Sequence, residues 1–431
     1  MTRNVVGCPV GGVDPEELID PQPLVREISD MLLGNRDFYD LPRKFKICIT
    51  GCKVWCPYPE INDIGLTPVV HPDSGEVGFS LRVGGGLSTT PHLAVKLNAW
   101  VRPREVCEVV RGITEVFRDS EVLRMHRERA RMKFLFLREG WTAESFQQEL
   151  EKRIGYALHR SVPEEVPGNE FRDHVGVHRQ KQKGLNFVGL SVFAGRLNAD
   201  QMQLVADVAE HNGDGTVRTT VMQNLVLLNI PDANVNAVRD ALADTPLLIE
   251  ANPFRRGTIA CTGMEFCKLA ITETKALSKQ IANHLAVTIP EFNGEVKVHV
   301  TGCPNSCGQH WIADLGLQGG RDKGDEAYDF FVGGGLGQEA CVARRIGVKV
   351  KTHEVKFGAE KLVRAYHKGR ENGQSFKNWS GRHTDDELAV FTLMGPLESN
   401  ALRGMISTYE RWKIGRESVP QFLCRYGMVG G

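Results

Sequence analysis

The chain has 431 residues, with 53 basic and 53 acidic side chains, so its formal net charge is zero. This length predicts two or three domains, and the charge balance argues against a nucleic-acid-binding arm or a membrane-surface protein. No apolar run reaches the ~20 residues that a membrane span needs. The N-terminal residues lack the apolar segment of a secretory signal, so we expect a cytoplasmic protein with reduced thiols.

The first 130 residues have the pattern of an α/β module. A β-branched run at residues 46–50 leads into a GC-x-x-x-C turn, and a second apolar stretch ends at VGGGL, residues 83–87. A helical pattern follows at residues 105–117. The next segment, residues 118–150, is charged and predicted to be largely helical, and EEVPGNEF has the composition of a linker.

Residues 173–252 form a different unit. The strand-like LNFVGLSVF precedes a helical pattern at residues 199–210, and the strand-like VRTTVMQNLVLLNI precedes another at residues 234–242. Strand, helix, two strands and helix is a ferredoxin-like order.

The α/β module then recurs. CITGCKVWCPYPEINDIGL, which begins at Cys48, aligns without gaps with HVTGCPNSCGQHWIADLGL, which begins at His299, at an offset of 251. VGGGL recurs at an offset of 249, and Arg3 and Cys8 recur as Arg256 and Cys261 at an offset of 253. Three matches in one order indicate a duplicated module. No ferredoxin-like unit precedes the first copy, so we expect such a unit to be missing there.

The expected organisation is an α+β fold with duplicated modules around a ferredoxin-like unit. We expect a first module at residues 1–130, a helical connector and linker at 131–172, the ferredoxin-like unit at 173–252, a second module at 253–387 and a tail of unassigned role at 388–431. A helix is expected within LESNALRGMISTYERW of that tail.

The eleven cysteines are too clustered for a disulfide framework in a reducing compartment. We interpret Cys107, Cys341 and Cys424, which stand alone, as structural thiols. Cys261, Cys267, Cys303 and Cys307 instead form two close pairs beside small and turn-forming residues. Four soft ligands of this kind suit a 4Fe–4S cluster, with tetrahedral zinc as the competing interpretation.

The residues around these cysteines carry a resemblance. ACTGMEFCKLAITETK followed by VTGCPNSCGQHWIADLG is similar to the signature of the assimilatory siroheme and 4Fe–4S nitrite and sulfite reductases. LPRKFK, EINDIG, VGGGLST, RMKFLF and FRDHVGV also fit this family, over residues 1–387. The resemblance implies that the four cysteines bind the cluster and that Cys307 is also the axial ligand of the siroheme iron. Such a shared thiolate would couple an electron store to the iron that holds the substrate.

The resemblance also implies an anion site. Arg3, Lys44 and Lys46 match the family's substrate-binding positions, and Lys44 and Lys46 are spaced to share one face of a strand. Without the resemblance a K-F-K strand would be read as a solvated face. Arg suits bidentate anion binding, while a desolvated Lys suits proton donation. Arg218, Gln223 and Asn224 are expected near the carboxylates of the macrocycle.

The implied activity is a six-electron reduction of nitrite to ammonium, or of sulfite to sulfide, with ferredoxin or a similar one-electron donor. The GCPVGGVDPEELIDPQPLV stretch favours nitrite slightly, although Lys46 is more typical of sulfite reductases. Alternatives are a related cobalamin-pathway enzyme, and an iron–sulfur electron-transfer subunit that is non-catalytic or belongs to a split enzyme with a separate N-terminal fragment.

The first module keeps three cysteines at the duplicated positions, Cys8, Cys52 and Cys56, but Asp14 stands where a fourth would fall. A second cluster completed by Cys48 or Asp14 is one interpretation, and a remnant of the duplication is the other. The GGGL turns do not fit a dinucleotide-binding G-x-G-x-x-G, so direct NAD(P)H use is disfavoured.

Overall fold

The structure is a computed structural model that describes the backbone of residues 2–415 and the side chains of residues 5–398 and 400–410. The chain divides into two compact units. Unit 1 comprises Met1–Ile259 and Gly335–Val342, and unit 2 comprises Ala260–Gly334 and the described residues from Ala343 onward. In the described part of the chain, no helix has both the length and the apolar character needed to cross a membrane.

The first sheet of unit 1 is built from β1 to β5 in chain order. β1, β2 and β3 pair in parallel, whereas β3, β4 and β5 form an antiparallel meander. The strands are β1 (Thr2–Gly7), β2 (Phe45–Ile49), β3 (Ile64–Val70), β4 (Val77–Val83) and β5 (Val95–Val101).

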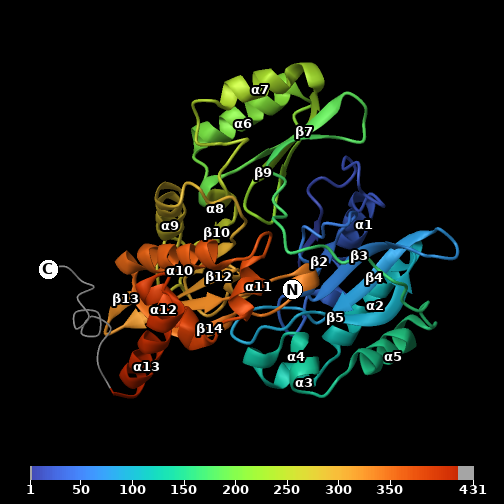
Figure 1. The fold of residues 1–431 in the computed structure, drawn as a ribbon. Coiled ribbons are helices and arrows are strands. Elements are labelled where there is room, and N and C mark those ends of the chain that lie inside the picture. Colours follow the sequence, from blue (N-terminus) through green and yellow to red (C-terminus); the bar gives the residue numbers. More distant parts are fainter. Residues whose placement is uncertain (1, 416–431) are drawn as a thin grey trace. The chain divides into compact units, whose positions relative to one another are not determined.

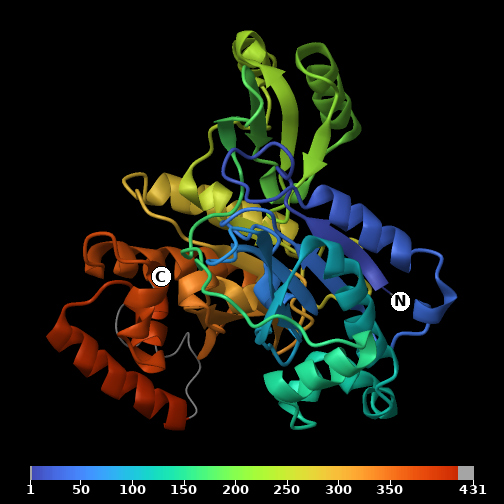
Figure 2. The same ribbon diagram turned by 90° about the vertical axis from the view of Figure 1, so that its right-hand side faces the viewer.

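Helices cover this sheet with apolar faces. Helix α1 (Gln22–Leu32) runs beside β1, as the blue segments of Figure 2 show, and α2 (Val106–Arg118) packs on α5 (Ala143–Ile154). Their side chains share one core with the strands, including Ile28, Ile113 and Phe146. Between α2 and α5 lie two short helices, α3 (Val122–Met125) and α4 (Lys133–Leu137). The segment expected to be largely helical therefore forms separate helices, and Leu135 and Leu150 in it join the core.

The second sheet of unit 1 has the order β6-β7-β9-β8. Its elements are β6 (Gly176–Arg179), β7 (Leu185–Leu190), α6 (Ala199–Asn212), β8 (Val217–Thr219), β9 (Leu225–Pro231) and α7 (Val235–Leu242). α6 and α7 lie together against the strands (Figure 1) and share a core with them. The predicted order of strand, helix, two strands and helix is observed in β7 to α7. The short helix α8 (Pro253–Arg256) follows.

The remaining sheet has the order β10-β11-β12-β13-β14. Its strands are β10 (Thr258–Ala260), β11 (Val298–Thr301), β12 (Leu315–Asp322), β13 (Asp325–Val332) and β14 (Arg344–Lys351). The helices of this part are α9 (Lys275–Thr288), α10 (Val355–Gly369), α11 (Phe376–Gly381), α12 (Asp385–Met394) and α13 (Ser399–Gly415). Helix α12 packs on α10 and β14 (Figure 1), and buries Leu388 and Phe391. The helix expected in the tail corresponds to α13.

The duplication extends to individual hydrogen bonds. The amide of Gly84 donates to the carbonyl of Asp63 at 2.9 Å, and the amide of Gly333 donates to the carbonyl of Asp314 at 3.0 Å. Both glycines have a φ near +77°, which is cheap only for glycine. The two VGGGL segments are therefore tight turns that fold back from β4 and β13. Together with the two sheets of equal strand number, they confirm the expected α+β fold of duplicated modules.

Candidate functional site

The four cysteines expected to bind a cluster all belong to unit 2. Cys261 directly follows β10, and Cys303 and Cys307 lie in the loop after β11. The amide of Cys261 donates to the carbonyl of Val300 at 3.0 Å, which ties the ends of these neighbouring strands together. The turn with Cys267 is closed by a bond from its amide to the carbonyl of Gly263, at 3.1 Å.

The pKa of the Cys303 thiol depends on the other three cysteines. Burial raises its pKa, and the charges of Cys307, Cys261 and Cys267 raise it further, so all four groups lie within electrostatic range. Cys307 is exposed, whereas Cys303 is buried. The amide of Gly302 donates to Sγ of Cys261 at 3.2 Å. Hydrogen bonds of this type to sulfur tune the potential of an iron–sulfur cluster.

The loops around these thiols are packed too tightly for larger residues. A Cβ on Gly308 would lie 2.2 Å from the carbonyl oxygen of Val300. Beside the same loop, three buried polar atoms have no hydrogen-bond partner among the described residues: Oγ of Ser306, Oε1 of Gln309 and Nε2 of His299. Buried polar groups are seldom left unpaired. Four thiols, close-packed turns and free polar atoms together fit a 4Fe–4S cluster.

A second group of charged residues lies at the start of β3 in unit 1. The amide of Lys46 donates to the carboxylate of Asp63 at 3.0 Å, and the guanidinium of Arg131 reaches both oxygens of that carboxylate at 2.9 and 3.0 Å. Asp63 is fully buried. The ion pair with Arg131 neutralises the charge of Asp63. The ammonium group of Lys46 is therefore not neutralised by this carboxylate alone.

The position of Lys46 alters its acidity. Burial and then the charge of Arg131 lower the pKa of Lys46 to about 8, and the charge of Lys44 contributes in the same direction. Lys44 is exposed and Lys46 is partly buried, and the charge of Lys44 reaches Lys46. A lysine that titrates near neutral pH can donate a proton as well as a charge.

Lys133 holds the neighbouring glycine turn. Its side chain is 1% exposed, and Nζ donates to the carbonyls of Gly86, Leu87 and Thr90. The RMKFLF segment fits the family in sequence, but the sequence predicts no role for its basic residues. The structure places Arg131 and Lys133 of this segment beside Lys46. Sequence spacing gave no signal for this, because the segments are far apart in the chain.

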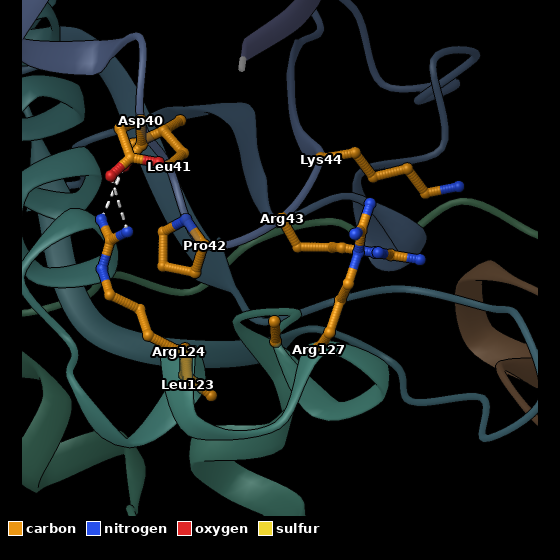
Figure 3. A pocket seen from close by; sticks show the side chains of 9 residues that line it. Asp40, Leu41, Pro42, Arg43, Lys44, Leu123, Arg124 and Arg127 are labelled. Carbon is orange, nitrogen blue, oxygen red and sulfur yellow. Dashed lines mark hydrogen bonds and ion pairs between the residues drawn. The ribbon is translucent and has the colours of Figure 1, made fainter.

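A cationic pocket of about 450 Å³ opens next to Lys44 (Figure 3). Asp40 is paired with Arg124 at 3.0 Å, and the other charged groups of the lining, Arg43, Lys44 and Arg127, are basic. Figure 3 shows these three side chains coming from the segment before β2 and from the segment after α3. Their arrangement can bind a carboxylate or a small oxyanion.

The other expected site residues make contacts that hold loops, or are not described. The side chain of Arg3 in β1 and all of Cys424 lie outside the described part of the chain. Arg218 donates to the carbonyls of Pro9 and Gly11 at 3.0 and 2.6 Å.

The Gln–Asn pair of the ferredoxin-like unit lies in the turn between β8 and β9. Asn224 accepts a bond from the amide of Val192 at 3.0 Å, and Gln223 has a φ of 63°. These contacts fix loops, and a role for Arg218, Gln223 and Asn224 toward a macrocycle stays a prediction.

Comparison with known families matches both kinds of module. Residues 1–158 and 252–379 match the nitrite and sulphite reductase 4Fe-4S domain, and residues 178–245 match the nitrite/sulfite reductase ferredoxin-like half domain. The two matches cover more than half of the chain, and the chain belongs to the nitrite and sulfite reductase family.

Individual relatives are similar over most of the chain. An assimilatory ferredoxin-dependent nitrite reductase of Haloferax mediterranei is 39% identical over 414 residues, which cover 90% of this chain and 69% of the relative. A ferredoxin sulfite reductase of Mycolicibacterium paratuberculosis is 36% identical over 398 residues, covering 90% and 70%. The structure of Mycobacterium tuberculosis NirA protein superposes with a TM-score of 0.85 at 36% identity, covering 90% of this chain and 71% of that one.

These matches confirm that the chain is an oxidoreductase with the expected cofactors of its family, a 4Fe–4S cluster and siroheme. Both nitrite and sulfite reductases occur among the relatives, so the comparisons support reduction of this class of oxyanion.

Proposed function

We propose that the chain reduces nitrite to ammonium by six electrons, with ferredoxin or a similar carrier as the one-electron donor. The observation that carries this proposal is that Cys261 is joined to the end of β11, the strand that leads to Cys303 and Cys307, within residues matched by the 4Fe-4S domain. When bound, siroheme and the cluster supply the redox chemistry, while the protein supplies binding, orientation and charge. Cys307, the exposed thiol, is our candidate for the ligand shared by both cofactors.

In this proposal the residues of unit 1 attract and protonate the anion. Arg43, Lys44 and Arg127 supply positive charge at the pocket, and Lys46 supplies a proton that leaves readily because its pKa is about 8. The buried carboxylate of Asp63 orients Arg131 and the backbone of Lys46. Arg3 is our candidate for a further anion-binding residue.

Fewer observations bear on the choice between nitrite and sulfite. The relative from Haloferax mediterranei is a nitrite reductase and that from Mycolicibacterium paratuberculosis a sulfite reductase, at similar identity. Nitrite is favoured by the N-terminal GCPVGGVDPEELIDPQPLV stretch, and sulfite reduction to sulfide is the second candidate. A separate N-terminal fragment has no support from the comparisons and stays a prediction.

The test is a product assay on the anaerobically purified full chain, with chemically reduced ferredoxin as donor. Ammonium formed from nitrite, and sulfide formed from sulfite, are measured in parallel at equal substrate concentration. We expect both products, with the larger kcat/KM for nitrite. A chain that holds its cluster and siroheme but forms neither product would contradict the proposal, and faster formation of sulfide would reverse the substrate assignment.

A further inference from the structure

A separate cluster of metal-binding side chains lies in unit 1. Cys8 directly follows β1, Cys52 and Cys56 lie in the loop after β2, and His174 precedes β6. Because β1 and β2 are parallel, the chain leaves both strands at the same edge of the sheet. The ligand atoms of Cys8, Cys56 and His174 all lie within 4.8 Å of one another, and Cys52 belongs to the same buried cluster as Cys8 and Cys56.

We propose that Cys8, Cys52, Cys56 and His174 bind a single structural zinc ion. Three thiolates and one imidazole form one of the common tetrahedral sets for structural zinc. Cys52 and Cys56 have three residues between them, which is within the usual spacing of such pairs. This site is independent of the 4Fe–4S cysteines, all of which belong to unit 2.

The size of the cluster favours one ion over a cube of four irons. Ligands around one tetrahedral zinc, with Zn–S bonds of ~2.3 Å, lie ~3.8 Å apart. The sulfurs of Cys8 and Cys56 are 3.1 Å apart. A 4Fe–4S cube attaches each thiolate to a different iron, so its thiolates stand further apart. In the described part of the chain, the tight grouping is found at Cys8, Cys56 and His174 and not at the four cysteines of unit 2.

The surroundings are those of a closed site. Cys8, Cys52 and Cys56 are at most 1% exposed and share an apolar cluster. Closed sites without an open position are typical of structural zinc. Nε2 of His174 is buried and has no hydrogen-bond partner among the described residues. The residues that enclose the thiols are Val10, Val13, Phe187, Val226 and Leu228.

The backbone holds His174 in an unfavourable conformation. Its φ is 58°, in the left-handed region that a side chain seldom adopts. A Cβ on Gly189 would lie 1.7 Å from the carbonyl oxygen of His174, so this close approach requires glycine in β7. Strain of this kind persists where the surrounding structure fixes the residue, and it is common at functional sites.

The residues proposed in the sequence as a fourth cluster ligand have other positions. The thiol of Cys48 is fully buried within β2 and does not belong to the group formed by Cys8, Cys56 and His174. Asp14 lies in the loop that follows Cys8, where its carboxylate accepts a hydrogen bond from the amide of Glu16 at 2.9 Å. A zinc ion here would join the ends of β1 and β2 to the segment that enters the ferredoxin-like sheet.

The test measures zinc and iron by mass spectrometry in the full chain, purified anaerobically with its cofactors. We expect about one zinc per chain, and loss of that zinc in Cys8→Ser and His174→Ala. Iron content and the visible spectrum should stay unchanged in both variants. Cys107→Ser, a cysteine-to-serine change outside the cluster, should keep its zinc.

A second measurement needs no variant. Zinc is removed from the wild-type chain with a chelator, and Co²⁺ is added anaerobically. Tetrahedral thiolate coordination should give intense charge-transfer and visible d–d bands, and added zinc should abolish them. The proposal is overturned if the wild-type chain holds no zinc and gives no cobalt bands, or if a Cys8–Cys56 disulfide is found in the anaerobic protein. Iron lost in Cys8→Ser would also overturn it, because the site would then hold iron.

Discussion

The backbone amide of Lys46 donates a 3.0 Å hydrogen bond to the buried carboxylate of Asp63. The duplicated pair repeats it, because the amide of Lys297 donates to the carboxylate of Asp314 at 2.8 Å. The bond fixes the strand that carries Lys46, and in unit 1 the same carboxylate also binds Arg131. A structural bond of the ancestral module thus holds a basic residue of the candidate anion site.

Replacing Asp63 tests that arrangement. Asp63→Asn keeps the size of the side chain but leaves the buried guanidinium of Arg131 without its carboxylate, and we expect a loss of about 3 kcal/mol in the free energy of unfolding. The measurement is a urea unfolding curve of the full chain. Asp40→Asn is the matched control, because the side chain of Asp40 is 93% exposed in its pair with Arg124. Equal midpoints for the two variants would contradict the argument.

Lys46 should give the activity a pH dependence. Since its pKa is about 8, the ammonium form is lost as pH rises through that value, and kcat/KM for the anion should fall over the same range. Lys46→Met should lower kcat/KM by about 100-fold, the usual scale for losing a general acid. Lys46→Arg keeps the positive charge, so the fall in kcat/KM of this variant should occur at higher pH. Identical pH profiles for the wild-type chain and Lys46→Arg would exclude Lys46 as the titrating group.

The lowered pKa of Lys46 also affects stability, and this effect increases with pH whereas the activity falls. Lysine in the unfolded chain titrates near ~10.4, so between about pH 8 and 10 the unfolded state binds more protons than the folded state. The contribution of Lys46 to the free energy of unfolding should therefore rise with pH in that window. Comparing Lys46→Met with the wild-type chain by urea unfolding at pH 7.5 and about 9.5 isolates this contribution. A larger rise in the variant would contradict the lowered pKa.

The cationic pocket should set the affinity for the anion. Arg127→Glu reverses one of the four basic groups that line the pocket, and we expect about a tenfold higher KM and a weaker dependence on ionic strength. Arg104→Glu is the control, because Arg104 is exposed and does not line the pocket. Steady-state kinetics at several salt concentrations make the comparison. An equal effect of both variants would mean that the net charge of the protein, and not the pocket, sets the affinity for the anion.

The cluster ligands can be tested one at a time. Cys303→Ser should reduce the iron content of the anaerobically purified chain and its broad visible absorption, because serine is a poor ligand for a 4Fe–4S cluster. Cys341→Ser should keep both, since Cys341 bonds to the carbonyl of Val342 at 3.4 Å and is not part of the group. Full iron content in Cys303→Ser would remove it from the ligand set.

The sequence predicted the repeated parts of the fold well, for a physical reason. Short segments such as T-G-C and V-G-G-G-L encode local turns, and the duplication makes each of these segments occur twice in the sequence. The ferredoxin-like order could also be predicted, because each of its elements has its own periodicity. The interruptions between α3, α4 and α5 could not, because packing into a shared core decides where those helices end.

The residues of the candidate site were harder to predict from the sequence than the fold. Cys261, Cys267, Cys303 and Cys307 were identified by spacing and resemblance. Arg131 meets Asp63 across 68 residues of sequence. The approach of His174 to Cys8 likewise depends on tertiary structure, and no local pattern specifies such partners. Sequence reasoning therefore proposed the sulfur ligands of one candidate metal site and did not single out the imidazole at the other.

The most direct test of the central claim is the visible spectrum of the anaerobically purified, cofactor-reconstituted full chain, before and after addition of nitrite. The account predicts the Soret and red bands of siroheme together with cluster absorption, a shift of the siroheme bands on addition of nitrite, and decoupling of the two cofactors in Cys307→Ser. Cluster absorption without siroheme bands, or siroheme bands that nitrite leaves unchanged, would contradict it.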